Sequence, residues 1–141
     1  MGTRSLTTFI DEFDKEEIVV MYRQYDGYPR GHGRDLFNYL NGTKVVNGIP
    51  GGKIVSQLAN GMSCLAAQVV SHFKKEVGNF YLHKSGTRDI GEQYVYTIYY
   101  DNSELKVKIR NLYEKDIMDR IIFNGNLKEM EKWLDKEKYW L

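Results

Sequence analysis

The alternation of apolar and polar residues near the N-terminus predicts two strands. Residues 5–10 are rich in β-branched and apolar side chains, and residues 18–25 repeat that character after the charged stretch 11–17. We expect these strands to pair as a hairpin. Because side chains alternate between the two faces of a strand, Arg23 falls at the end of an otherwise apolar face, an unusual place for a guanidinium group.

A longer apolar pattern predicts a central helix. Apolar residues recur three and four positions apart over residues 54–77, as in an amphipathic helix, and Gly78 would close it. Gly61 lies inside this pattern, so the segment could consist of a short helix followed by a longer one over residues 62–77. Either arrangement buries the same apolar stripe.

Two shorter helices are predicted on either side of it. Residues 34–40 form the first, which ends at an Asn-Gly dipeptide suited to a left-handed cap. Residues 126–139 form the second, with Asn126 and Glu129 spaced as a capping box. Its buried stripe consists of Leu127, Met130, Trp133 and Leu134.

The C-terminal half predicts a long Tyr-rich hairpin. Strands are expected over residues 80–83, 93–100 and 121–123, with a loop over 84–91. A two-residue turn at Asn102-Ser103 places Tyr100 opposite Leu105, Ile98 opposite Val107 and Tyr96 opposite Ile109, so apolar residues share one face. The other face collects Lys106, Lys108 and Arg110 across from Tyr99, Thr97 and Val95.

These elements predict an α+β fold with one core. We expect an antiparallel sheet, with an N-terminal hairpin and the Tyr-rich C-terminal hairpin, packed against one long central helix and a C-terminal helix. The length of 141 residues suits a single ligand-binding domain over residues 1–141. The order of the strands in the sheet does not follow from the sequence.

Composition narrows the classes of partner. Lysine plus arginine number 20 against 19 acidic residues, so the net charge of +1 gives no reason to expect a nucleic-acid polymer or a membrane as the partner. The single Cys64 excludes an internal disulfide, and three histidines at non-ligand spacings indicate no metal site. No cofactor is expected. The N-terminus lacks an apolar segment, so we expect no signal peptide and a cytoplasmic location.

Arginine and aromatic residues instead indicate a site for a nucleotide-like anion. Residues 26–33 form a loop rich in glycine, but they match neither a phosphate-binding loop nor a dinucleotide fingerprint. Guanidinium groups bind phosphate oxygens and aromatic rings stack on bases. Both kinds of side chain lie in or beside the glycine-rich loops and strand ends: Arg23, Arg30, Arg34, Arg88 and Arg110, with Tyr25, Tyr28, Phe80 and Tyr81.

Three segments of the chain resemble a known family. Residues 1–6, 22–33 and 78–94 look like the first-described type of phage anti-Thoeris defence sponge, and the resemblance spans most of residues 1–110. It implies a protein of the host bacterial cytoplasm that binds a glycocyclic ADP-ribose immune signal without cleaving it. It also implies a homodimer or a hexamer, with the signal at a subunit interface and, in some members, a further site for cyclic oligonucleotides.

Carried over to matching positions, the resemblance implies six ligand contacts: Arg23, Tyr28, His32, Phe80, Arg88 and Arg110. Residues 114–141 match no pattern of this family.

Two other functions stay open. One is an enzyme that degrades the same signal, with His32 or His83 paired with Asp89 or Glu92 as acid and base. The other is an adaptor that binds a host protein through the Tyr-rich face.

Overall fold

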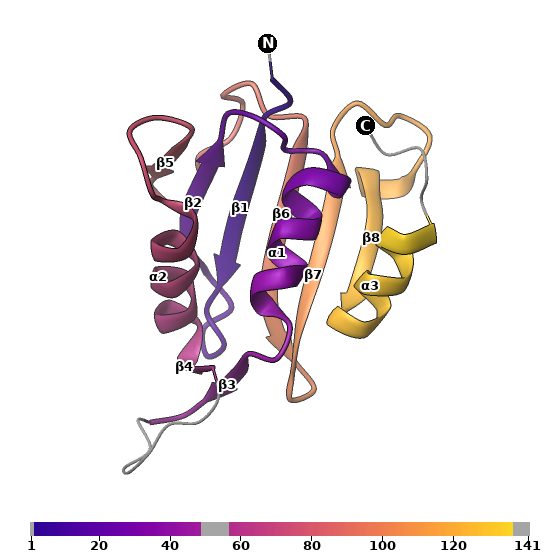
Figure 1. Cartoon of the computed structure of the whole chain (residues 1–141). Coiled ribbons are helices and arrows are strands. Elements are labelled where there is room, and N and C mark those ends of the chain that lie inside the picture. The colour runs from indigo at the N-terminus through magenta and orange to yellow at the C-terminus, as the bar shows by residue number, and fades with distance from the viewer. Residues whose placement is uncertain (1, 49–56, 137–141) are drawn as a thin grey trace.

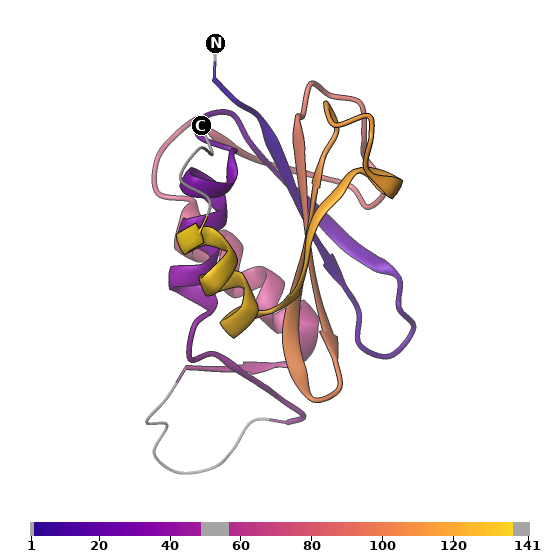
Figure 2. The same cartoon turned by 90° about the vertical axis from the view of Figure 1, so that its right-hand side faces the viewer.

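The computed structural model describes residues 2–48 and 57–136, and its main feature is a six-stranded sheet with helices packed on one side (Figures 1 and 2). The strand order is β5-β2-β1-β6-β7-β8. The predicted α+β class is confirmed. The strands are β1 (Ser5–Ile10), β2 (Glu17–Arg23), β5 (Phe80–His83), β6 (Tyr94–Asp101), β7 (Glu104–Asn111) and β8 (Ile121–Asn126).

The N-terminal hairpin contains a β-bulge that the sequence pattern did not reveal. Thr8 pairs with Val20, but Ile10 pairs with Glu17, so β2 has one extra residue. Ile18 and Val19 consequently both pack against the core beneath the helices. A bulge re-aims the side chains beyond it, and here it directs Glu17 to the opposite face.

A parallel pairing joins the two halves of the sheet. β1 runs parallel to β6, and Thr8 Oγ1 donates a hydrogen bond of 3.1 Å to Thr97 Oγ1 across a separation of 89 residues. Every other pairing in this sheet is antiparallel. The expectation of an antiparallel sheet therefore holds except at its centre.

The register predicted for the C-terminal hairpin is confirmed. β6 pairs with β7 through Tyr100–Leu105, Ile98–Val107 and Tyr96–Ile109. Asn102 and Ser103 both have positive φ, 51° and 62°, as a two-residue hairpin turn of matching twist requires. β8 extends to Asn126, three residues beyond the predicted strand.

The helices are α1 (Arg34–Leu40), α2 (Gly61–Phe73) and α3 (Leu127–Lys136). The predicted capping box is confirmed, because Asn126 Oδ1 accepts the Glu129 N–H at 2.8 Å and Glu129 Oε1 accepts the Asn126 N–H at 2.9 Å. Residues 137–139 of the predicted helix lie outside the described residues.

The structure corrects two expectations about helical segments, the first of them in part. The central helix begins at Gly61, as the alternative with a break at that glycine predicts, but it ends at Phe73. The segment before it is not a short helix: Leu58–Asn60 is a strand, β4, parallel to β3 (Lys44–Val46), and residues 54–56 lie outside the described part. Val77 is 98% exposed, so the apolar spacing there did not mark a buried turn. The glycine-rich loop is also not wholly irregular, since Pro29–Gly33 forms a π-helical turn that continues into α1.

Gly61 begins α2 for a specific steric reason. Its φ is +80°, and a Cβ at this position would lie 2.7 Å from Oε2 of Glu12. That carboxylate accepts the Met62 N–H at 3.1 and 3.2 Å from its two oxygens, and so caps the helix. Because alanine is strained at positive φ and would displace the cap, Gly61→Ala is expected to lower the free energy of unfolding by about 2 kcal/mol.

Urea unfolding followed by circular dichroism measures this loss. Gly48→Ala is a matched control for backbone strain alone, since Gly48 has φ +102° but nothing within 4 Å of its Cβ position. If both variants lose the same stability, Glu12 contributes nothing to the effect.

The two faces of the sheet are buried in different ways. The helix face, which the three helices cover, contains the main apolar core with Phe9, Met21 and Tyr96. The loop face contains a smaller cluster of Leu6, Val20, Tyr22 and Val95, against which Ile90 and Leu112 pack. Ile90 belongs to the crossover loop, residues 84–93, which connects edge strand β5 to β6 by crossing β2 and β1 on this face.

Candidate functional site

The six residues that the resemblance implies divide between the two faces. Arg23, His32 and Phe80 meet on the helix face, and Tyr28 lies on the loop that precedes the π-helical turn. Arg88 lies on the crossover loop and Arg110 on β7, where its side chain alternates to the loop face. Within the described chain, therefore, the six side chains do not line one common cavity.

Arg23 is bound internally. Its Nε donates to the Tyr25 carbonyl oxygen at 2.6 Å, and one terminal nitrogen lies 2.8 Å from Oδ2 of Asp35. The guanidinium carbon sits 5.1 Å from the centre of the Phe80 ring. The pairing with Asp35 explains how a guanidinium that is only 9% exposed can end an apolar strand face.

His32 is fully buried and its tautomer is fixed by its neighbours. A terminal nitrogen of Arg23 lies 3.0 Å from Nδ1, and Thr7 Oγ1 lies 2.6 Å from Nε2. Arginine can only donate, so Nδ1 accepts and the proton resides on Nε2. Burial, with the Arg23 charge beside the ring, lowers the pKa of His32 well below its usual value. His32 is thus held neutral.

Tyr28 and Phe80 are partly buried around this network. Phe80 contacts the Phe73 ring with centroids 5.4 Å apart, in addition to Arg23. The Tyr28 hydroxyl lies 3.4 Å from Oδ1 of Asp26. The bonding groups of Arg23 and His32 are satisfied within the chain, so their roles as ligand contacts stay predictions.

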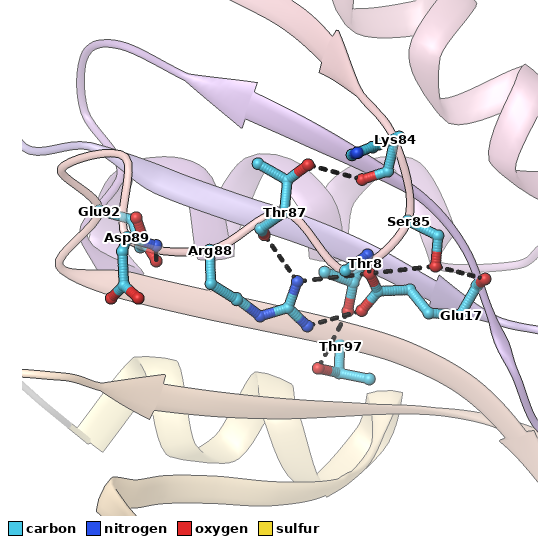
Figure 3. Close-up of polar contacts among 10 residues, drawn as sticks. Thr8, Glu17, Lys84, Ser85, Thr87, Arg88, Asp89, Glu92 and Thr97 are labelled. Atoms are coloured by element: carbon cyan, nitrogen blue, oxygen red, sulfur yellow. Dashed lines mark hydrogen bonds and ion pairs between the residues drawn. The ribbon is translucent and has the colours of Figure 1, made fainter.

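The crossover loop is held to the loop face by one carboxylate. Glu17 Oε1 lies 2.6 Å from a terminal nitrogen of Arg88, and Oε2 accepts the Gly86 N–H (Figure 3). Ser85 Oγ donates to the main-chain oxygen of Glu17 at 2.8 Å. Burial alone would raise the pKa of Glu17, but the hydrogen bonds from Arg88 and Gly86 outweigh it and lower that pKa.

The far end of the same loop is organised by Glu92. Its carboxylate accepts the N–H groups of Asp89 and Ile90 at 3.0 and 2.9 Å, and the residue is 6% exposed. The two carboxylates named as partners of a histidine in the enzyme alternative therefore differ: Glu92 shapes the loop, while Asp89 is exposed at its surface.

Strand β7 presents three cations on the loop face. Lys106 is paired with Asp101 at 3.0 Å, but within residues 2–48 and 57–136 neither Lys108 nor Arg110 forms an ion pair with a carboxylate. Burial, followed by the Arg110 charge, lowers the pKa of Lys108. Nε of Arg110 is buried without an acceptor in the described chain. Asp119 partly offsets the charge at Lys108, and the positive charge that remains on this strand favours an anion nearby.

A groove adjoins these cations. Its volume is about 360 Å³. Lys108 and Lys15 supply positive charge, which Asp11 and Asp101 of the same lining balance. Thr97 adds a hydroxyl group and Tyr99 an aromatic ring. The complete lining is Ile10, Asp11, Lys15, Thr97, Tyr99, Tyr100, Asp101 and Lys108. A phosphorylated molecule with a ring would find both types of contact here.

The sequence pattern predicted the cationic face of the β6–β7 hairpin but not the residues on the opposite wall of the groove. Lys15 lies in the charged turn of the N-terminal hairpin, which carried no motif, and Glu17 reaches this face only through the bulge in β2. The pattern could not place the Glu17 side chain on this face, because strand alternation counted from Met21 assigns it to the helix face.

Comparison with known proteins returned no matching family model, no matching curated protein and no matching solved structure. Among the described residues, no set of three or more His, Cys, Asp or Glu side chains is placed to hold a metal ion. No helix in that part of the chain has both the length and the apolar character needed to span a bilayer.

Proposed function

We propose that this chain is a phage-encoded sponge that binds a cyclic ADP-ribose-type signalling nucleotide in the bacterial cytoplasm and holds it without cleavage. The observation that carries the proposal is the loop face of β7, where the groove brings Lys108 and Tyr99 together and where Arg110, outside the groove lining, forms no ion pair with a carboxylate in the described chain. A pyrophosphate requires cations and an adenine requires a ring, and this face supplies both.

Binding is favoured over cleavage by the state of two candidate catalytic groups. His32 is buried, neutral and bonded through both ring nitrogens, and the Glu92 carboxylate is occupied by backbone N–H groups. A general acid or base must reach the proton it transfers, and neither group faces the groove. A sponge that does not turn over must bind tightly, and a nanomolar dissociation constant corresponds to about −12 kcal/mol.

We also propose that the sponge is a homo-oligomer. In the described part of the chain, edge strand β5 pairs with β2 on one side; it contains no Lys, Arg, Asp or Glu, although Lys74 Nζ donates to its Phe80 carbonyl oxygen at 2.9 Å. Tyr81 and Leu82 on this strand are 50% and 55% exposed. A second copy of the chain would cover them, and Phe80 would then lie close to a subunit interface.

Calorimetry with cyclic ADP-ribose tests the assignment of the site. Arg110→Ala and Phe80→Ala are each expected to weaken binding by about tenfold or more: the first removes a cation of the loop face, and the second removes a stacking ring of the helix face that lies close to the proposed subunit interface. Lys132→Ala is the matched control, because it removes one exposed cation from α3 and leaves the loop face intact. Thermal melts of each variant separate lost contacts from lost folding.

Unchanged affinity in both Arg110→Ala and Phe80→Ala would refute these two assignments. The fate of the ligand tests the mechanism: after incubation and heat denaturation, mass spectrometry is expected to recover the cyclic molecule intact. A linear product would establish the enzyme instead. No binding of cyclic ADP-ribose, together with no nucleotide released from purified protein, would favour the adaptor.

A further inference from the structure

The crossover loop already binds an anionic group, the carboxylate of Glu17 from the same chain. The Glu17 carboxylate lies against Arg88, with oxygen-to-nitrogen distances of 2.6 and 3.3 Å, and it accepts the Gly86 N–H (Figure 3). A guanidinium group beside an exposed backbone N–H is a donor set that proteins use to bind oxyanions. Gly86 has φ +88°, and the space beside its Cα is open to 4 Å.

The position of Glu17 results from the bulge in β2. Without the extra residue, strand alternation would direct this side chain to the helix face, away from Arg88. The loop itself does not depend on the carboxylate alone. Ser85 Oγ bonds to the main-chain oxygen of Glu17, and Ile90 packs against the apolar cluster of the loop face. The loop can therefore keep its place when the carboxylate leaves.

We propose that residues 85–88 form an anion-binding loop in which Glu17 occupies the place of a ligand phosphoryl group. An incoming phosphoryl oxygen displaces the carboxylate and takes over the donors of Arg88 and Gly86. The placement of a nucleotide on this face rests on the proposed function, whereas the exchange of Glu17 for a simple phosphate anion does not.

The exchange is chemically reasonable because the internal pair lies at the surface, with Arg88 open to solvent and Glu17 partly covered. The Arg88 and Glu17 side chains are 37% and 14% exposed, and ion pairs near the surface contribute little to stability. A phosphoryl group brings more negative charge and more acceptor oxygens than a carboxylate. Glu17 thus raises the ligand concentration needed to fill the loop and excludes weaker anions.

Inorganic pyrophosphate is the probe for this exchange. Glu17→Gln keeps the shape of the side chain and one acceptor oxygen but removes the charge that competes for Arg88. Calorimetry is expected to show pyrophosphate binding to Glu17→Gln about tenfold more tightly than to the unmodified protein. Adding Arg88→Ala to Glu17→Gln is expected to abolish this gain.

Two further variants keep the test decisive. Glu16→Gln removes the same charge from an exposed neighbouring residue, and its affinity for pyrophosphate is expected to equal that of the unmodified protein. Glu17→Asp keeps the charge but shortens the side chain, so it is expected to bind pyrophosphate more tightly as well. This second variant also serves if Glu17→Gln does not fold.

The proposal is overturned if neither Glu17 variant binds pyrophosphate more tightly, or if the gain persists without Arg88. A parallel titration with cyclic ADP-ribose distinguishes failure of this proposal from failure of the proposed function. Binding of cyclic ADP-ribose with no gain on replacing Glu17 refutes the exchange and leaves the sponge. A gain for pyrophosphate without binding of cyclic ADP-ribose supports the anion loop, and together with no nucleotide released from purified protein it refutes the sponge.

Discussion

Replacing Arg23 by methionine is expected to lower the free energy of unfolding by about 3 kcal/mol, because it removes a buried guanidinium group and leaves its partners, among them the fully buried His32, without their donor. The methionine would fill the space of the aliphatic stem but would not bond to Asp35 or to the Tyr25 carbonyl. The contact between the guanidinium and the Phe80 ring is also lost. Chemical denaturation measures the change.

Arg34→Met is the matched control for this experiment. Arg34 also pairs with an aspartate, Asp135, at 2.6 Å, and lies 5.9 Å from an aromatic ring, that of Phe37. Its pair is much more exposed, with side chains 32% and 63% accessible, so its loss is expected to cost at most about 1 kcal/mol. Equal losses in the two variants would mean that the burial of Arg23 adds nothing.

Lowering the pH from 7.5 to 5.0 is expected to destabilise the protein through His32, by about 2 kcal/mol from this group alone. In the folded chain its pKa lies well below 6.5, owing to burial and to the Arg23 charge. The unfolded chain therefore binds more protons below pH 6.5, and stability falls as the pH drops from 6.5 toward the folded pKa. Above this window the contribution is complete.

His32→Gln isolates this effect. A glutamine can accept from Arg23 and donate to Thr7, as the imidazole does, but it does not titrate. Between pH 5.0 and 6.5, the free energy of unfolding is expected to rise with pH less steeply in His32→Gln than in the unmodified protein. The difference in slope corresponds to about one bound proton. Between pH 7.5 and 8.5 the two slopes are expected to match. Identical slopes throughout would mean that His32 is not held neutral.

The parts of the fold that local rules determine were predictable. A two-residue turn combined with strict alternation permits one register for β6 and β7, so the pairing of Tyr100 with Leu105 followed from the sequence. The cap at Asn126 and Glu129 was predictable because both partners lie within one helical turn. Strand β1 was placed at its observed bounds, since its composition has little helical character.

Features that depend on distant contacts were not predictable. The apolar spacing over residues 54–77 fits a helix, yet Leu58–Asn60 pairs with β3 and the helix starts only at Gly61, where Glu12 supplies the cap. Spacing cannot reveal a carboxylate that arrives from fifty residues away. The parallel contact between β1 and β6 likewise depends on tertiary packing alone.

The same distinction applies to the candidate site. The cations of β7 were found because the hairpin register places them on one face, and the arginine of the crossover loop was found because it lies in a glycine-rich loop. Glu17 was missed because one inserted residue in β2 reverses the face on which it lies. Arg23 was singled out by its unusual place on an apolar face and His32 by the resemblance, and the structure joins the two in one internal network.

The parallel pairing at the centre of the sheet has a consequence for synthesis of the protein. β1 leaves the ribosome well before its inner neighbour β6, as the 89-residue separation of Thr8 and Thr97 shows. Contacts between residues so far apart in the sequence slow folding. The nascent chain therefore carries one edge of β1 unpaired until β6 has been made, and the two halves of the sheet can join only after that.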